Sequence, residues 1–226
     1  MLEAAQCHYL ANVMRCHRGD EVGLFNGLDG EWLGQIESLA KRRCDIGLVR
    51  QIRPQPPAPD LWLVFAPVKK QAIDTLAAKA TELGVSRLQP VITERCNIGR
   101  MNAGRMRAQA IESAEQCRRL DLPEIAPPVA LSELLAAWPD GRILIFCDET
   151  GKGEAPAAAF SGLGIPARPA ALLIGPEGGF SEHEADLIRS HKAAIAIGLG
   201  PRILRADTAA LAGLAVWQAL RGDWRG

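Results

Sequence analysis

The stretch LLIGPEGGFSEHEAD, residues 172–186, shows most clearly how this chain is built. A run of aliphatic residues, typical of a strand buried in a parallel sheet, stops at Gly-Pro-Glu-Gly-Gly. Ser181 and Glu184 then form an S-x-x-E capping box, which predicts that a helix begins there. The glycines therefore precede a helix N-terminus, where a ligand's polar atoms can meet backbone N–H groups. A tight turn that needs glycine only for its backbone angles explains the same residues.

Strands and helices alternate on both sides of this stretch. The segment RPQPPAPD, residues 53–60, holds four prolines and is typical of a stiff linker. After it, strands are predicted for LWLVFAPV, VSRLQPVI, RILIFCDE, ALLIG and AIAIGLG. Helices are predicted for KKQAIDTLAAKATELG, residues 103–119, SELLAAW, SEHEADLIRSH and DTAALAGLAVWQAL. A Gly/Ala/Pro-rich loop is expected after RILIFCDE. This order predicts an α/β fold with a parallel sheet that helices cover on both faces.

The segment before the prolines has a different pattern. EVGLFNG, EWLGQIESL and RRCDIGLVRQI have the short alternating patterns of strands, so the first 53 residues are expected to form a small β-rich domain. The predicted domains are therefore residues 1–55 and residues 61–226.

Composition excludes several classes of protein. The chain has 226 residues, 48% of them apolar, and no net charge. It has no secretory h-region at its start and no apolar run of the roughly 20 residues that span a membrane, so a cytoplasmic location and no membrane partner are expected. Six cysteines without a CxxC pair indicate free thiols. Cys7-His8 and Cys16-His17 match no common zinc spacing, so no metal site is expected.

Ligands of parallel α/β sheets bind at the carboxyl ends of the strands. Three such ends are unusual here: FCDETGKGE, GPEGGFS and GPRILRADTA. In the last, the apolar pair Ile203 and Leu204 predicts a loop tucked into the fold. Asp207 or Thr208 can cap the final helix. The segments GLGPRI and GLGIPA lack the third glycine of the dinucleotide fingerprint, and GKG lacks the frame of a P-loop.

Two of these motifs together resemble a known family. LLIGPEGGFSEHE at residues 172–184, followed by GLGPRILRADTA at residues 198–209, is similar to the paired signature of the SPOUT methyltransferases. Within them the chain most resembles the ribosomal small subunit methyltransferase E family. Three further segments also match that family: KATELGVSRLQPVITERC, ESAEQCRRLDLPEI and HYLANVMRCHRGDEVGLFNG. The resemblance implies a PUA-like β-barrel RNA-binding domain, then a SPOUT α/β domain whose C-terminal part forms a deep trefoil knot.

The resemblance also implies an activity. Family members transfer a methyl group from S-adenosylmethionine to N3 of one uridine in 16S rRNA, so the implied partners are this rRNA or the assembled small ribosomal subunit, and a second copy of the chain in a homodimer. The implied cofactor-binding residues are Ile174, Gly175, Pro176, Glu177, Gly178, Gly179, Ile197, Leu199, Gly200, Ile203, Leu204, Arg205 and Ala206. The carboxylate of Glu177 suits a sulfonium and an amine better than phosphates.

Catalytic and RNA-binding candidates follow. N3 of uracil is protonated at neutral pH, so Arg205 is expected to stabilise charge on the base and Asp207 to orient Arg205 or move the proton. A salt bridge between the two explains them equally well, and Asp207 stands where the family usually has Glu. The excess of four positive charges in residues 61–121 predicts an RNA-contacting face. Its candidates are Arg95, Arg100, Arg105, Arg107, Arg118 and Arg119.

Two other functions remain open. A SPOUT enzyme acting on another RNA, such as tRNA, has the same fold, and so does an RNA-binding protein without activity. Binding of S-adenosylmethionine separates the second alternative from either enzyme.

Overall fold

The computed structural model describes residues 2, 4–40, 43–67, 70–96, 101–164 and 168–225. The chain forms two compact units, Met1–Pro57 and Ala58–Gly226. Within the described ranges, none of the helices combines the length and apolar character needed to cross a bilayer.

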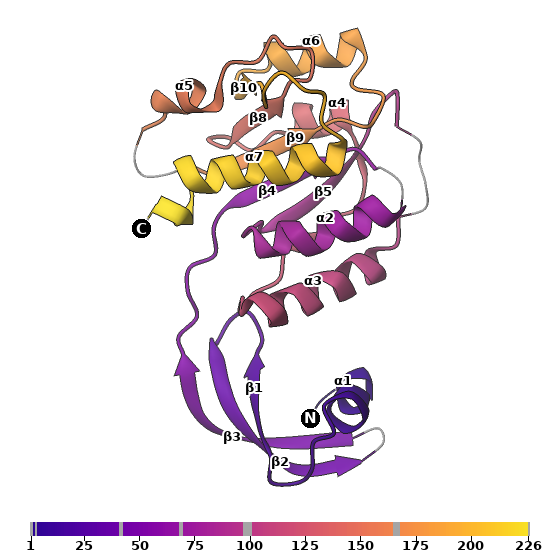
Figure 1. The fold of residues 1–226 in the computed structure, drawn as a ribbon, viewed down its shortest axis with the longest axis vertical. Coiled ribbons are helices and arrows are strands. Elements are labelled where there is room, and N and C mark those ends of the chain that lie inside the picture. The colour runs from indigo at the N-terminus through magenta and orange to yellow at the C-terminus, as the bar shows by residue number, and fades with distance from the viewer. Residues whose placement is uncertain are drawn as a thin grey trace. The chain divides into compact units, whose positions relative to one another are not determined.

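The first unit is built on an antiparallel sheet of three strands in the order β1-β2-β3 (Figure 1). These are β1 (Glu21–Phe25), β2 (Glu31–Ala40) and β3 (Arg43–Arg53), in the segments where the sequence predicts strands. The start of the unit, for which the sequence predicts no element, forms α1 (Ala4–His8) and a π-helical stretch η1 (Tyr9–Val13). Cys7 and Leu10 lie three residues apart and bury together against the sheet, so tertiary packing selects a helix there.

The second unit is an α/β fold whose strands pair in parallel, as the sequence predicts. Its sheet has the order β10-β8-β9-β4-β5-β6, and β7 pairs separately with β5. The strands are β4 (Leu61–Phe65), β5 (Arg87–Ile92), β6 (Glu124–Ile125), β7 (Val129–Ala130), β8 (Ile143–Cys147), β9 (Ala170–Ile174) and β10 (Ala194–Ile197). The carboxyl ends of neighbouring strands β8, β9 and β10 therefore meet at one edge.

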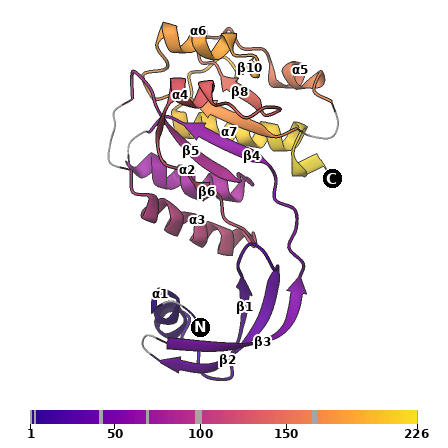
Figure 2. The same cartoon turned by 180° about the vertical axis from the view of Figure 1, so that it is seen from behind.

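Helices cover both faces of this sheet (Figures 1 and 2). One face packs on α2 (Lys70–Glu82), α3 (Ala103–Cys117), α5 (Pro156–Ser161) and α7 (Ala206–Leu220), and the other on α4 (Leu131–Ala136) and α6 (Glu182–Ser190). A short 3₁₀ turn, η2 (Asp223–Arg225), follows α7. Along β4, Leu63 and Phe65 pack in the first layer and Val64 in the second, which explains why both faces of the strand are apolar.

The helix α5 corrects the expected loop after β8. Pro156 begins the helix, where its missing N–H costs nothing, and Phe160 is buried against Trp217 of α7 with ring centroids 5.2 Å apart. A short helix of about one and a half turns therefore forms in this Gly/Ala/Pro-rich segment, and burial of Phe160 stabilises it.

Candidate active site

A cavity of about 300 Å³ lies at the carboxyl ends of β8 and β10. Its walls are the turn after β8, residues 147–151, the turn after β10, residues 198–204, and Ala209 of α7. We call residues 198–204 the cavity turn. Two of the three strand ends that the sequence singles out therefore come together around one space.

Main-chain hydrogen bonds hold these two walls edge to edge. The N–H of Asp148 donates to the carbonyl of Ile197 at 2.9 Å, and the N–H of Gly198 donates to the carbonyl of Glu154 at 2.9 Å. A Cβ at Gly153 would overlap the main chain of Ile197 and Gly198. The close approach of the two backbones thus requires glycine at position 153.

Asp148 carries a buried negative charge beside the cavity. Its Oδ2 accepts from Nη2 and Nε of Arg189 at 2.8 and 3.0 Å, and its Oδ1 accepts from the N–H and hydroxyl of Thr150 at 2.9 and 2.6 Å. Burial opposes ionisation, but the bonds from Thr150 and Arg189 outweigh it and hold the pKa of Asp148 below its usual value. The carboxylate fixes the turn after β8 to α6 and has no oxygen left for a substrate.

Cys147 supplies apolar surface to the cavity. Burial, and then the nearby Glu149, raise the pKa of this thiol far above its ordinary range. The side chain is therefore neutral and unsuited to nucleophilic attack.

The cavity turn brings together four of the residues predicted to bind a cofactor: Leu199, Gly200, Ile203 and Leu204. Leu199 and Leu204 are half-buried, whereas Ile203 is 89% exposed. The expectation that both apolar residues tuck into the fold is thus wrong for Ile203, whose side chain is largely exposed at the cavity. Ile197, at the end of β10, and Ala206, at the start of α7, are buried and flank the turn without lining the cavity.

The second predicted group does not line this cavity: it consists of Ile174, the last residue of β9, and the residues after it, Gly175, Pro176, Glu177, Gly178 and Gly179. We call residues 175–179 the glycine turn. Gly179 has φ +67°, and a Cβ there would overlap the carboxylate of Glu149, which does line the cavity. Glu177 and Gly178 are exposed. The glycine turn therefore reaches the cavity only through Glu149.

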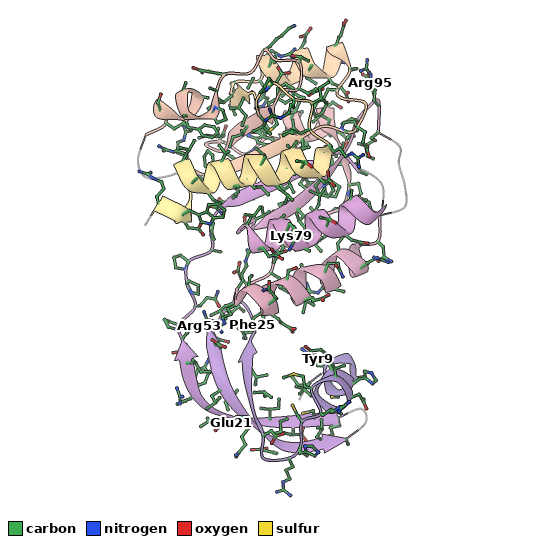
Figure 3. All side chains as sticks on the ribbon, in the orientation of Figure 1. Tyr9, Glu21, Phe25, Arg53, Lys79 and Arg95 are labelled. Atoms are coloured by element: carbon green, nitrogen blue, oxygen red, sulfur yellow. The ribbon has the colours of Figure 1, made fainter. Side chains whose placement is uncertain are left out.

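Arg95 holds the glycine turn, and Glu184 holds the start of α6 that follows it. Nη1 of Arg95, on the loop after β5 (Figure 3), donates to the carbonyls of Gly178 and Phe180, both at 3.2 Å. The predicted capping box is confirmed: Ser181 Oγ accepts from the N–H of Glu184, and the Glu184 carboxylate accepts from that of Ser181. The same carboxylate accepts from the N–H of Glu94 at 2.8 Å. The long-range bonds of Arg95 and Glu184 could not be predicted from neighbouring residues in the sequence.

The catalytic candidates lie where the cavity turn enters α7. Arg205 is the exposed N-cap residue, and the helix begins at Ala206 without a side-chain cap, so the expectation that Asp207 or Thr208 caps it is wrong. Asp207 Oδ1 instead accepts from the N–H of Thr208 at 2.8 Å. Among the ion pairs of the described residues there is none between Arg205 and Asp207. Arg205, as the N-cap, and Asp207, in the first turn, both lie at the N-terminus of α7, where the helix dipole is positive.

The predicted RNA-contacting arginines differ in how they are engaged. Arg105 pairs with Asp74 at 2.6 Å. Arg119 is 10% exposed, binds both oxygens of Asp121 and donates to the carbonyl of Thr81 at 2.8 Å, so its guanidinium serves the fold. Arg107 is exposed, and Arg118 is exposed at the end of α3 with φ +60°. Arg100 lies outside the described residues.

Metal ligands do not cluster in the described ranges: no group of three or more His, Cys, Asp or Glu side chains could hold an ion there. The six cysteines are free thiols, with Cys7, Cys44 and Cys147 buried.

Comparison with known proteins identifies the family. Residues 54–218 match the model of the RNA methyltransferase domain, and residues 2–49 match that of the RNA methyltransferase PUA domain. The ribosomal RNA small subunit methyltransferase E of Rickettsia conorii is 32% identical over 92% of this chain and 84% of its own length. The Bacillus subtilis protein of the same name is 25% identical over 96% of this chain and 90% of its own. The chain belongs to the ribosomal RNA small subunit methyltransferase E family.

Solved structures of this fold contain the cofactor. The ribosomal RNA small subunit methyltransferase E of Neisseria gonorrhoeae, bound to S-adenosyl methionine, superposes with a TM-score of 0.86 at 26% identity, covering 99% of this chain and 92% of its own. A Legionella pneumophila structure with the cofactor SAM bound has a TM-score of 0.83 at 28% identity, covering 96% and 90%. The family resemblance that the two C-terminal motifs predict is confirmed, and with it the class of enzyme, an RNA methyltransferase.

Proposed function

We propose that this chain transfers a methyl group from S-adenosylmethionine to N3 of a uridine in 16S rRNA. The observation that carries the proposal is the cavity at the ends of β8 and β10, one wall of which is the GLGPRIL segment of the family signature. Membership of a family whose relatives are named for small subunit rRNA methylation supports this substrate over tRNA and over a binding protein without activity.

The residues around the cavity fit the cofactor. Leu199, Ile203 and Leu204 offer apolar surface to an adenine ring, and Glu149 offers a carboxylate to a sulfonium or an amine. When bound, S-adenosylmethionine supplies an electrophilic methyl group. Ile174 to Gly179 stay in the proposal as residues that reach the cofactor beside Glu149, because Gly179 and Glu149 lie against each other.

The chain's own task is to make uracil nucleophilic. Loss of the N3 proton leaves negative charge on the base, and this charge needs a fixed positive partner. Arg205 is exposed at the rim of the cavity turn and lies at the N-terminus of α7, so its guanidinium and the helix dipole reinforce each other. Asp207, two residues on, is the candidate that accepts the N3 proton or orients Arg205.

Four features remain proposals that rest on the family. The close backbone approach at Gly153 supports a trefoil knot, in which residues after β10 pass through an earlier loop. The match to a PUA model supports closure of the first unit as an RNA-binding barrel. Exposed Ile203 supports a homodimer that covers it. The cytoplasm, where small ribosomal subunits are assembled in bacteria, is the proposed location.

The RNA-contacting face is proposed to lie along α3, with Arg107 and Arg118 as exposed cations. Arg95 and Arg105 contribute as far as their bonds to Gly178 and Asp74 allow, and Arg119 is withdrawn because its guanidinium is engaged within the fold.

Nucleoside mapping of 16S rRNA tests the function. Ribosomes from cells with and without the gene are digested, and the nucleosides are located by mass spectrometry. One 3-methyluridine present only with the protein supports the proposal. An unchanged 16S rRNA with a new methyl group in tRNA favours the alternative RNA substrate, and no change in any RNA overturns enzymatic function on RNA.

A further inference from the structure

A second cavity, of about 510 Å³, lies wholly within the N-terminal unit. It shares no lining residue with the candidate active site. One part of its lining is apolar: Phe25 at the end of β1, Leu28 in the β1–β2 loop, Trp32 of β2 and Leu48 of β3. Leu28 and Leu48 are 79% and 62% exposed and line the same hollow as Phe25 and Trp32. This unit therefore presents apolar and aromatic surface around a hollow.

The polar part of the lining is fixed in advance. Asn26 Oδ1 accepts from the N–H groups of Leu28 and Asp29 at 2.9 Å, and its Nδ2 donates to the Asp29 carboxylate at 2.7 Å. The carbonyl of Asp29 in turn accepts from Nε1 of Trp32 at 2.9 Å and from Nε2 of Gln51 at 2.8 Å. The indole is thus held in one orientation, so a ligand that stacks on it meets a surface that needs no reordering.

Gln55 supplies an unused acceptor. Its side chain lines the cavity, and its Oε1 is buried without a hydrogen-bond partner among the described residues. A buried carbonyl oxygen without a donor is costly, and such groups usually have a partner in the functional state. The cavity therefore lacks one N–H donor at a defined place.

The charges of the described lining do not favour a phosphate. Neither lysine nor arginine is among the described residues that line the cavity, whereas Asp29 is. Arg53, which lies at the same end of the sheet as Phe25 (Figure 3), is paired with Glu31 at 2.6 Å. A flat, largely apolar group that carries N–H donors fits this lining, and an unpaired nucleobase has those properties.

We propose that this cavity binds one unpaired base of the RNA substrate, stacked beside Trp32 and Phe25, with an N–H of the base donating to Gln55 Oε1. The inference rests on the proposed function only for the identity of the substrate as RNA. Proteins read single-stranded RNA by stacking splayed-out bases on aromatic side chains and bonding their edges. The N-terminal unit would then supply sequence recognition, while methyl transfer belongs to the cavity at β8 and β10.

Binding of a fluorescently labelled, single-stranded oligoribonucleotide of mixed sequence to the full chain at fixed salt tests the proposal. Leu28→Asp places a charge at the mouth of the cavity and Gln55→Leu removes the acceptor, so each should weaken binding at least fivefold. Val49→Asp, at a position 56% exposed on β3 and outside the lining, is the matched control and should bind as the wild type does. Gln55→Leu should not lower the melting temperature, because it removes a buried group without a partner.

Methylation of 16S rRNA by the same variants separates this inference from the proposed function. Leu28→Asp and Gln55→Leu should raise the KM for RNA and leave kcat and cofactor affinity unchanged. Wild-type affinity for the oligonucleotide in both variants overturns the base-binding site. A wild-type protein that binds RNA through Leu28 and Gln55 but methylates no rRNA overturns the proposed function and supports the base-binding site.

Discussion

Two turns follow strands of the same sheet, the buried strand β9 and the edge strand β10, and they use glycine differently. In the glycine turn after β9, Gly179 adopts a left-handed φ and lies against Glu149, while Arg95 bonds the carbonyl of Gly178. In the cavity turn after β10, Gly200 has φ +94° with no atom near the place of a Cβ, and the neighbouring residues line an open space. One turn is packed against the protein itself and the other faces a cavity.

The difference teaches that glycine at a strand end does not by itself mark a ligand. At Gly179 the close approach that excludes a side chain comes from the protein's own carboxylate. The cavity turn is marked better by its apolar residues, because Ile203 lines the cavity and is 89% exposed. Changes in each turn should therefore separate effects on stability from effects on chemistry.

The largest effect is expected at the end of the cavity turn. Arg205→Ala removes the cation proposed to stabilise the deprotonated uracil, and loss of one such group lowers kcat by about 10²- to 10³-fold. Cofactor affinity measured by calorimetry should change little. Arg225→Ala, an exposed arginine in η2, is the control and should retain full activity. Activity of Arg205→Ala within threefold of the wild type would remove Arg205 from the mechanism.

The next largest effect is expected at the buried ion pair that joins the turn after β8 to α6. Asp148→Asn loses the charged bonds to Arg189 and should lower the free energy of unfolding by about 2–3 kcal/mol at neutral pH. Asp186→Asn removes the exposed partner of the same arginine, 3.3 Å away, and should cost about 0.5 kcal/mol or less. Urea denaturation of both variants makes the comparison, and equal losses would show that the buried pair is not special.

The same pair predicts a pH dependence. Because the pKa of Asp148 is lower in the folded protein than in the unfolded chain, its charge stabilises the fold above the unfolded pKa, near 3.9, and this stabilisation is lost as pH falls through the folded pKa. The gap in stability between wild type and Asp148→Asn should shrink over that acidic range. A gap that stays constant down to acid pH would contradict the assignment.

A smaller effect separates two adjacent glycines. Gly179→Ala forces a side chain into a left-handed conformation and against Glu149, so we expect a loss of about 1–2 kcal/mol in unfolding free energy. A Cβ at Gly178 would lie 3.7 Å from that of Arg95, an ordinary contact, so Gly178→Ala should stay within about 0.5 kcal/mol. Thermal melts of the two variants test this, and a reversed order would show that the turn is constrained differently.

The smallest effect concerns RNA contact on α3. Arg107→Ala should reduce the slope of log affinity for rRNA against log salt by about one unit or less, without loss of stability. Arg119→Ala should instead destabilise the fold, because it leaves Asp121 without its partner. If Arg107→Ala left the slope unchanged, Arg107 would not be part of the RNA-contacting face.

Local patterns predicted what depends on neighbours in sequence. The capping box of Ser181 and Glu184 and the strands around it follow from spacings of a few residues. The helices α1 and α5 were missed because each depends on one or two anchors, such as Phe160, that find their partners only in the folded chain. Short helices carry too little periodicity to be recognised without those partners.

The candidate site divides in the same way. Sequence motifs pointed to Leu199, Gly200, Ile203 and Leu204, and the cavity contains all four. They marked the strand end that holds Asp148 and Glu149, but not the partner of Asp148, Arg189, 41 positions away, nor the approach of Glu149 to Gly179. Composition also could not predict that the Arg119 guanidinium bonds within the fold, because its partners Asp121 and Thr81 are brought to it by tertiary packing. Pairings of this kind are fixed by tertiary structure alone.

Calorimetric titration with S-adenosylmethionine tests the central claim, that the cavity at the ends of β8 and β10 holds the cofactor. Leu204→Arg places a cation in the cavity turn, where it would repel the sulfonium, and Leu187→Arg makes the same change on the exposed side of α6. We predict that wild type and Leu187→Arg bind with equal affinity and that Leu204→Arg binds at least tenfold more weakly, with all three chains folded by circular dichroism. Equal affinity in all three proteins, or no binding by the wild type, would contradict the account.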